Sequence, residues 1–329
     1  REVFEPLGMT RSRFSWPEGE ALPLAVPHDQ AGGTLEKRPA HEGNAAASLH
    51  TTAAEYGRFV AAWMGGELLG DAAQAEALEP VSFPQPDEES ADEEAWRRLA
   101  WGLGWGIQLD ERMGAAADTN EALDHLYFHW GDNGPFKAFV AFRPATGDGI
   151  VYFANSTHGL AIGPALVNPV VGSMDVAFEA LGYERVDAAG FSERLEGAIA
   201  ESEGRLAEAV EAYRAALTVD PDNEITARQV EWIGDLLAVE QSPVEVPVET
   251  LESYAGSYGP RRLVVEEEEL FYRREGRDRF RLIPLTATLF ALDGMTDFRL
   301  EIDLGQDGRP KKIIGHYVGG GTDESPRDP

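Results

Sequence analysis

The strongest constraint on the fold is a pair of short β-type segments joined by a tight turn near the middle of the chain. Residues 136–142 are aromatic, β-branched or small, and residues 150–154 are again apolar. Pro144 and the run 147–149 (Gly-Asp-Gly) between them have turn chemistry, so the pair is predicted to form an antiparallel hairpin. Two further segments extend the prediction to an antiparallel meander: 101–109 and 125–130.

Helical patterns flank this meander on both sides. Thr52 and Glu55 have the spacing of a capping box, in which each side chain bonds to the other residue's backbone amide. Apolar residues then follow at helical spacing up to Gly65-Gly66, which is predicted to end the helix. A second helical pattern covers residues 163–181. The first region is therefore predicted to mix helices with an antiparallel sheet.

Residues 191–239 have a helical pattern throughout. Small or aromatic residues occur here at the offsets of the second helix of a tetratricopeptide repeat: Gly204, Ala209, Tyr213, Ala216 and Pro221. One repeat, or one and a half, is present, whereas a binding groove requires about three. The segment is predicted to be a helical spacer.

The C-terminal part is predicted to be a small β domain. Residues 242–248 carry two prolines and read as an extended linker. Short alternating runs separated by turn residues follow and favour a small sheet or half-barrel: 262–265, 270–274, 280–284, 288–292, 298–304 and 311–318. Residues 319–329 are predicted to be a disordered tail.

Composition excludes several functions. The formal net charge of the 329 residues is −30, which is the opposite of the positive surface that nucleic acids and anionic membranes require. The chain has no Cys, so it forms no disulfide, thiolate zinc site or cysteine nucleophile. No run approaches the roughly 18 apolar residues of a membrane helix. Neither a membrane segment nor a nucleic-acid partner is expected.

Familiar catalytic motifs are missing from these residues. There is no Gly-x-Ser-x-Gly, Walker loop, dinucleotide fingerprint or His-Glu-x-x-His, and no Ser is followed three residues later by Lys. His125 and His129 fall on one face of a predicted strand without a third ligand, which argues against zinc. No metal and no cofactor is expected.

The best candidate site is the run 129–134, His-Trp-Gly-Asp-Asn-Gly, at the end of a predicted strand. The imidazole of His129 can polarise a hydroxyl or donate to a carboxylate. Gly131 leaves room for a ligand along the strand edge, and the backbone amide of Asp132 can face a developing oxyanion. By the motif alone, a structural role for this His is the more common one.

Four ordered segments resemble the C-terminal half of the serine β-lactamase and penicillin-binding-protein-like family, which includes class C-type β-lactamases, DD-peptidases and related esterases. They are Phe4-Glu-Pro-Leu-Gly-Met9, the segment 46–59, Trp101-Gly-Leu-Gly-Trp105, and Phe128-His-Trp-Gly131 with the strand after it. The resemblance covers roughly residues 1–180, about half of the family's domain. His129-Trp130-Gly131 matches the His form of the family's third motif, Lys or His, any residue, then Gly.

The resemblance implies an acyl-serine hydrolase with defined roles for this run. His129 would assist the nucleophile region and bind the substrate carboxylate, the amide of Asp132 would donate in the oxyanion hole, and Trp130, Gly131 and Asn133 would contact substrate. The family's Ser-x-x-Lys and Tyr-x-Asn motifs, which precede these segments, do not occur in the chain, which opens at Arg1. We therefore expect a C-terminal portion that is inactive alone. Family habit suggests a periplasmic or extracellular location.

The β tail resembles the lipocalin-like domain often appended to such hydrolases, where it shapes the site or aids assembly. The resemblance rests on Tyr254-Ala-Gly-Ser-Tyr258 and the apolar runs after it. The predicted fold class is α+β: an incomplete β-lactamase-like antiparallel sheet with flanking helices, a tetratricopeptide-like segment and a half-barrel. The predicted divisions are 1–185 (hydrolase part), 186–240 (helical), 241–250 (linker), 251–318 (β domain) and 319–329 (tail).

A second hypothesis remains open at this point. The chain is either part of a hydrolase acting on a small molecule or peptide, or a non-catalytic remnant whose helical and β segments bind a protein partner or a second copy. The resemblance also implies that strand 150–154 pairs with a strand outside this chain. In the isolated first region it would be an open apolar edge, so poor solubility at low salt is expected.

Overall fold

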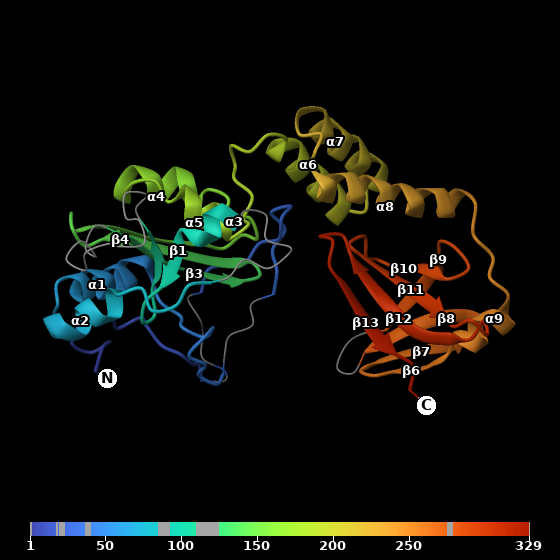
Figure 1. Ribbon diagram of the computed structural model, residues 1–329, viewed down its shortest axis with the longest axis horizontal. Coiled ribbons are helices and arrows are strands. Elements are labelled where there is room, and N and C mark those ends of the chain that lie inside the picture. Colours follow the sequence, from blue (N-terminus) through green and yellow to red (C-terminus); the bar gives the residue numbers. More distant parts are fainter. Residues whose placement is uncertain are drawn as a thin grey trace. The chain divides into compact units, whose positions relative to one another are not determined.

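The computed structural model describes residues 2–17, 19, 24–36, 41–84, 93–109, 125–274 and 279–328. The chain divides into two compact units, Arg1–Ala188 and Ala189–Pro329 (Figure 1). The second unit contains both the predicted helical segment and the predicted β domain. The boundaries expected at residues 185, 240 and 250 remain predictions.

The first unit is built on a five-stranded antiparallel sheet whose strands follow one another in chain order. The strands are β1 (Leu99–Trp101), β2 (Gly106–Gln108), β3 (Leu126–Asn133), β4 (Phe136–Arg143) and β5 (Asp148–Ala154). The predicted antiparallel arrangement is confirmed. The single strand expected over 101–109 is wrong, because Gly104 adopts a φ of 90° and the Gly102 amide bonds to the Trp105 carbonyl (2.9 Å). This turn folds the segment back into the β1–β2 hairpin.

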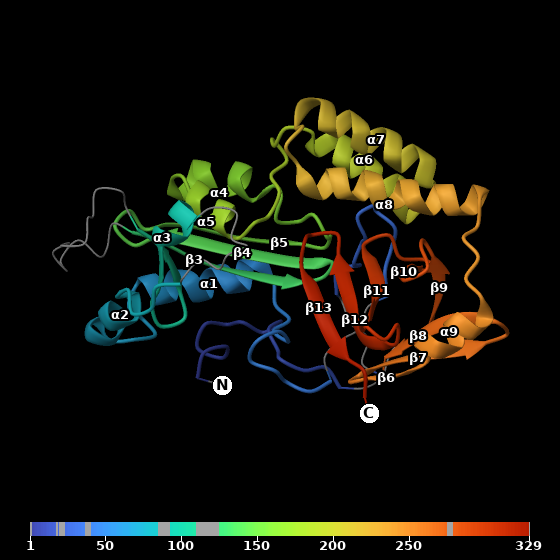
Figure 2. The same cartoon turned by 45° about the vertical axis from the view of Figure 1, so that its right-hand side comes forward.

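Helices cover both faces of this sheet (Figure 2). On one face lie α1 (Ala53–Met64) and α2 (Asp71–Leu78), and on the other lie α3 (Glu93–Arg97), α4 (Gly163–Val171) and α5 (Asp175–Ala180). Because side chains alternate along a strand, Tyr127 packs with the α1 side and the adjacent Phe128 with the α4–α5 side. The helix expected over 163–181 is two helices, since Gly172 takes a φ of 101°.

The start of α1 only half follows the capping box. The Thr52 side chain accepts from the Glu55 amide (3.2 Å), as predicted. The Glu55 carboxylate is buried and instead accepts from the Arg11 amide (3.0 Å) and from Ser12 Oγ (2.6 Å). A tertiary contact thus replaces the local return bond and ties the N-terminal segment to the helix.

The second unit begins with three helices, α6 (Phe191–Ser202), α7 (Leu206–Val219) and α8 (Glu224–Gln241). Tyr213 of α7 is buried against Gly197 of α6, where an added Cβ would lie 2.6 Å from the Tyr213 ring. This close approach explains a Gly inside α6. The tetratricopeptide likeness remains a prediction. Within the expected linker, α9 (Val248–Tyr254) begins directly after Pro247.

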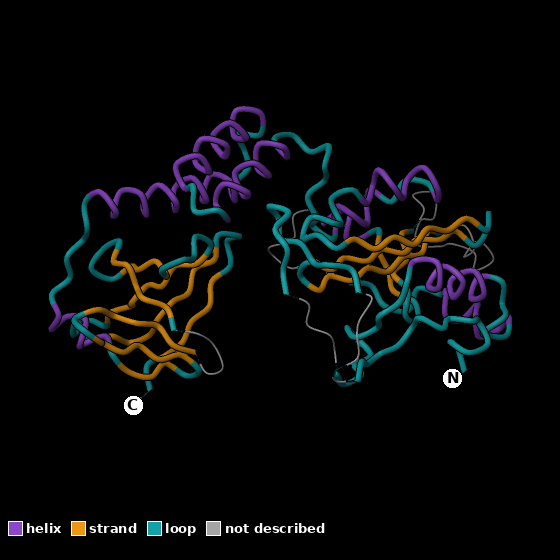
Figure 3. Tube along the Cα trace, turned by 180° about the vertical axis from the view of Figure 1, so that it is seen from behind, coloured by secondary structure: helices purple, strands orange, loops and turns teal. Residues whose placement is uncertain are grey.

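An eight-stranded meander completes the second unit (Figure 3). Its strands are β6 (Gly256–Tyr258), β7 (Arg261–Glu266), β8 (Glu269–Arg274), β9 (Phe280–Pro284), β10 (Leu289–Leu292), β11 (Phe298–Leu304), β12 (Pro310–Tyr317) and β13 (Thr322–Pro326). The two ends of the sheet approach each other: Arg261 of β7 pairs with Asp323 of β13, and the amide of Asp328, just after β13, bonds to the Ser257 carbonyl of β6 (2.9 Å). The sheet is therefore a nearly closed barrel, larger than the expected half-barrel, and its lipocalin likeness remains a prediction.

The expected disordered tail is wrong for most of its length. Residues 322–326 form β13, which pairs in antiparallel register with β12 from Lys312↔Pro326 to His316↔Thr322. β13 cannot be predicted from apolar patterning, because its residues are mostly polar and only Ser325 in it is buried. Backbone pairing with an otherwise open edge supplies the order that hydrophobic patterning does not reveal.

None of the helices in the described ranges is both long and apolar enough to cross a lipid bilayer.

The exposed edge of the first sheet leads to a testable prediction. β5 is the last strand in the order, and Phe153 on it is 39% exposed. Unpaired backbone groups beside apolar side chains promote edge-to-edge association. Residues 1–188 alone are expected to aggregate at low ionic strength, as measured by size-exclusion chromatography with light scattering. A monodisperse monomer would contradict the expectation.

Candidate active site

The predicted site lies where β3 loses one of its two neighbours. β2 pairs with β3 only from Leu126 to Phe128, whereas β4 pairs with β3 as far as Asn133. From His129 onward, the edge of β3 opposite β4 has no strand partner among the described residues. This open edge is the kind of surface along which an extended ligand can lie.

The turn after β3 determines which backbone amides face the open edge. Asn133 and Phe136 are the last cross-strand pair, so Gly134-Pro135 is a two-residue turn. Gly134 has a φ of 59° while proline is held near −65°, a combination that fits a type II′ turn. The closing pair of such a hairpin exchanges hydrogen bonds, and bonding alternates along antiparallel strands. The Asn133 amide therefore faces β4, and the Asp132 amide faces the open edge.

The His129 ring is exposed and its tautomer follows from one contact. Nδ1 lies 2.8 Å from the backbone oxygen of Trp130. A carbonyl oxygen can only accept, so Nδ1 carries the proton. In the neutral ring, Nε2 is then left with its lone pair and can accept a proton, and in the charged ring it can donate to an anion. Trp101 packs against the imidazole with ring centroids 5.6 Å apart.

Trp130 and Gly131 shape the surface beside this histidine. Trp130 is partly buried and its ring lies 5.8 Å from that of Trp101. A Cβ added to Gly131 would meet only the Ala138 Cβ, at 3.6 Å, which is an ordinary contact. The packing of the chain itself therefore does not require glycine here. Trp101 was predicted as part of a strand and of a segment that carries the family resemblance, without a role at the site; its place beside His129 follows from the unexpected β1–β2 hairpin.

The Asp132 side chain is held by two groups that sequence reasoning missed. Lys137, itself only 8% exposed, forms an ion pair with its carboxylate, and the Tyr183 hydroxyl donates to it (2.9 Å). Partial burial alone would raise the pKa of Asp132, but these two hydrogen bonds and the Lys137 charge hold that pKa below its ordinary value. Lys137 lies directly opposite Asp132 across the hairpin. The turn at 134–135 could have revealed this pair of opposite charges.

Asn133 is tied to the neighbouring loop, since its side-chain amide donates to the Ala47 carbonyl (3.1 Å). Residues near 47 therefore border the end of β3. His125 is buried, in contrast to the exposed His129. Among the residues that the structure describes, no three or more His, Asp or Glu side chains gather as metal ligands would.

The Asp132 ion pair predicts a pH dependence of stability. Because the folded-state pKa is lowered, this carboxylate stabilises the fold fully above its unfolded pKa of about 4, and the contribution is lost as the pH falls through the folded value. Asp132→Asn should lower the free energy of unfolding most near neutral pH, and the difference from the unaltered chain should shrink on acidification. Urea denaturation at a series of pH values measures this.

The matched control is Asp148→Asn, which removes one exposed carboxylate from β5 of the same sheet. It separates the Asp132 ion pair from a general effect of charge. A difference between Asp132→Asn and the unaltered chain that stays constant from neutral to acid pH would contradict the expectation.

Comparisons with known proteins identify the family of this chain. A family model described as Beta-lactamase matches residues 1–166, just over half of the chain. No curated protein sequence matches. Similar solved structures include the octameric penicillin-binding protein homologue from Pyrococcus abyssi, with 15% identity and a TM-score of 0.35, covering 96% of this chain and 55% of that one.

Two further structures are similar over shorter stretches. The D-alanine carboxypeptidase AmpC from Burkholderia cenocepacia has 21% identity and a TM-score of 0.33, with 46% of this chain and 48% of that chain covered. A class C β-lactamase has 20% identity and a TM-score of 0.34, with coverages of 55% and 50%. The chain thus spans about half the length of the solved structures it matches. Because the family model matches more than half of its residues, the chain belongs to the Beta-lactamase family.

Proposed function

We propose that the first unit supplies one wall of the cleft of a serine hydrolase that acts by acyl transfer on an amide, β-lactam or ester. In such a reaction a serine attacks the carbonyl carbon, the leaving group departs, and water releases the acyl group from the serine. The observation that carries the proposal is the open edge of β3, which presents His129, Gly131 and the Asp132 amide together. Family membership supports the reaction class.

Each group on this edge has a chemical role in the proposal. The Asp132 amide donates to the oxygen that becomes negative as the carbonyl is attacked, where a fixed donor stabilises the transition state more than the ground state. The ion pair with Lys137 and the bond from Tyr183 hold the residue that carries this amide. Trp130, Gly131 and Asn133 form the surface along which the substrate lies.

His129 binds and orients in this proposal. With Nδ1 bonded to the Trp130 carbonyl, Nε2 is directed to substrate, where the charged ring donates to a carboxylate and the neutral ring accepts from a hydroxyl. The nucleophile and the general base come from Ser-x-x-Lys and Tyr-x-Asn motifs, neither of which occurs in these 329 residues. The second unit has no catalytic part in this proposal. No feature of the described residues favours the non-catalytic alternative.

The test compares turnover of nitrocefin and p-nitrophenyl acetate by two proteins. Chain 1–329 is expected to give no rate above buffer, because it contributes no acylated serine. The product of the same gene with whatever is encoded before Arg1 is expected to hydrolyse at least one substrate and to gain the mass of an acyl group at a Ser-x-x-Lys serine. Turnover by chain 1–329 that His129→Ala abolishes would overturn the division of roles.

A further inference from the structure

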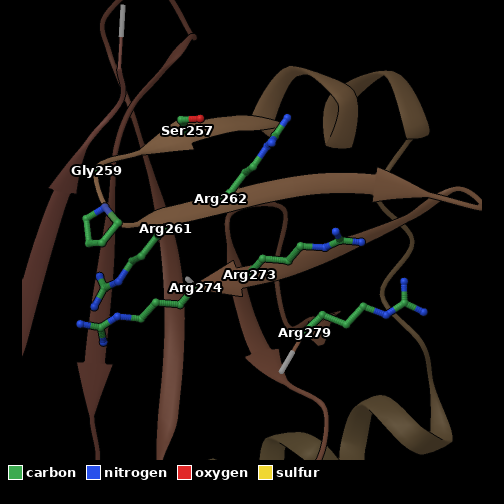
Figure 4. Close-up of a pocket in the computed structure, with 8 residues that line it drawn as sticks. Ser257, Gly259, Arg261, Arg262, Arg273, Arg274 and Arg279 are labelled. Carbon is green, nitrogen blue, oxygen red and sulfur yellow. The ribbon is translucent and has the colours of Figure 1, made fainter. Parts of the chain in front are cut away.

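Five arginines line a pocket at one end of the barrel in the second unit. They are Arg261, Arg262, Arg273, Arg274 and Arg279, here called the arginine cluster, and the pocket has a volume of about 520 Å³ (Figure 4). The chain carries a formal net charge of −30, so a local concentration of cations is contrary to its overall composition. The cluster lies on β7, β8 and the residue before β9, in the second unit, whereas the proposed hydrolase site belongs to the first unit.

The strand register of the barrel places four of these arginines in cross-strand pairs of like charge. Arg261 lies opposite Arg274, and Arg262 lies opposite Arg273, in consecutive cross-strand pairs of β7 and β8. Figure 4 shows the Arg261 and Arg274 side chains extending side by side from the two strands. Like charges directly opposite each other destabilise a sheet. Successive pairs project to opposite faces of the sheet, so the buried Arg261 and the exposed Arg262 lie on different faces, and each pair brings two like charges together on its own face.

The described carboxylates do not neutralise the cluster. Asp323 pairs with Arg261, which is only 4% exposed and whose Nε lacks a hydrogen-bond partner among the described residues. Glu266 is shared by Arg273 and Arg279. Arg262 and Arg274 are exposed and form no ion pair with any residue that the structure describes. Asp328 accepts from the Gly259 amide beside the pocket (3.4 Å), so the described residues place three carboxylates near the five guanidinium groups.

We propose that the arginine cluster binds a small polyanion with two or more phosphate groups. Guanidinium groups match the oxygens of phosphate in bidentate geometry, and they stay charged at every relevant pH. A phosphate group carries more negative charge than a carboxylate, which suits several arginines gathered at one pocket. The pocket volume falls within the usual range for small-ligand sites. This site is independent of the proposed hydrolase activity.

Isothermal titration of chain 1–329 with pyrophosphate tests the proposal. The unaltered chain is expected to bind, with affinity falling as salt rises. Arg262→Ala with Arg274→Ala should weaken binding by about tenfold for each guanidinium removed. The same double variant should unfold at no lower temperature than the unaltered chain when no ligand is present, because it removes one arginine from each like-charged pair. A purely structural role for these arginines would lower that temperature.

The matched control is Arg214→Ala with Arg309→Ala, which makes the same change in net charge at exposed arginines outside the pocket. It should bind pyrophosphate as the unaltered chain does. Citrate, whose carboxylates carry a similar total charge, distinguishes phosphate from carboxylate recognition and should bind at least about tenfold more weakly than pyrophosphate. Absence of pyrophosphate binding, equal losses in both double variants, or equally tight citrate binding would each overturn the proposal.

Discussion

In the hydrolase proposed above, His129→Ala is expected to lower kcat/KM by about 100-fold or more, because it removes the imidazole that the described part of β3 presents at its open edge. The structure leaves Nε2 of this ring available, since Nδ1 donates to the Trp130 carbonyl. Steady-state hydrolysis of nitrocefin and p-nitrophenyl acetate measures the change. If the histidine binds the substrate carboxylate, the loss should be larger for nitrocefin, which carries one, than for the uncharged ester.

Two further variants make this result specific. His316→Ala removes a histidine from β12 of the other unit and should leave the rates unchanged. Gly131→Ala should lower kcat/KM without lowering the melting temperature, because its Cβ contacts only Ala138 in the chain but would occupy the ligand's path. Hydrolysis by His129→Ala at the rate of the unaltered enzyme would remove the site from consideration.

Phe139→Ala is expected to lower the free energy of unfolding of the first unit by about 3–5 kcal/mol. Phe139 is 1% exposed and stacks on Phe178 of α5 with ring centroids 4.6 Å apart. It also stacks on Phe128 of β3, at 6.1 Å. Truncation would leave a cavity between the sheet and α5 that neighbouring rings cannot fill.

Urea unfolding followed by tryptophan fluorescence suits this measurement, because six of the seven tryptophans lie before residue 189. Phe136→Ala on the same strand is the matched control. Phe136 is 36% exposed, so its truncation should cost no more than about 1 kcal/mol. Similar losses for the two variants would show that the stacked rings do not form the core of this unit.

The strands that could be predicted are those with local turn chemistry and strong apolar patterning. β4 and β5 flank a Gly-containing turn and are rich in aromatic and β-branched residues, and the sequence suffices to find them. β13 follows a run of three glycines but lacks the apolar pattern, because its order comes from backbone pairing with β12 and not from buried side chains. The predicted strand over 101–109 is interrupted at Gly104, and the predicted helix over 163–181 is interrupted at Gly172. Both glycines adopt positive φ values, which a pattern of residue types does not reveal.

Only part of the candidate site could be predicted from the sequence. The order His129, Trp130, Gly131 is a local motif, and resemblance to a family gave it a meaning. The open edge is not local, because it exists only where β2 ends while β3 continues. Tyr183 lies 51 positions from Asp132 in the chain, and no spacing rule connects the two.

By itself, the sequence determined the elements whose apolar period and turns agree, the net charge and the residues capable of chemistry, since all of these depend on near neighbours. Only the tertiary structure decided which edge of β3 is open, which amide faces it, and what holds Asp132. It also brought the arginines of β7 and β8 into opposing pairs around one pocket. These features depend on strand register and on contacts between distant segments, which are fixed when the whole core packs.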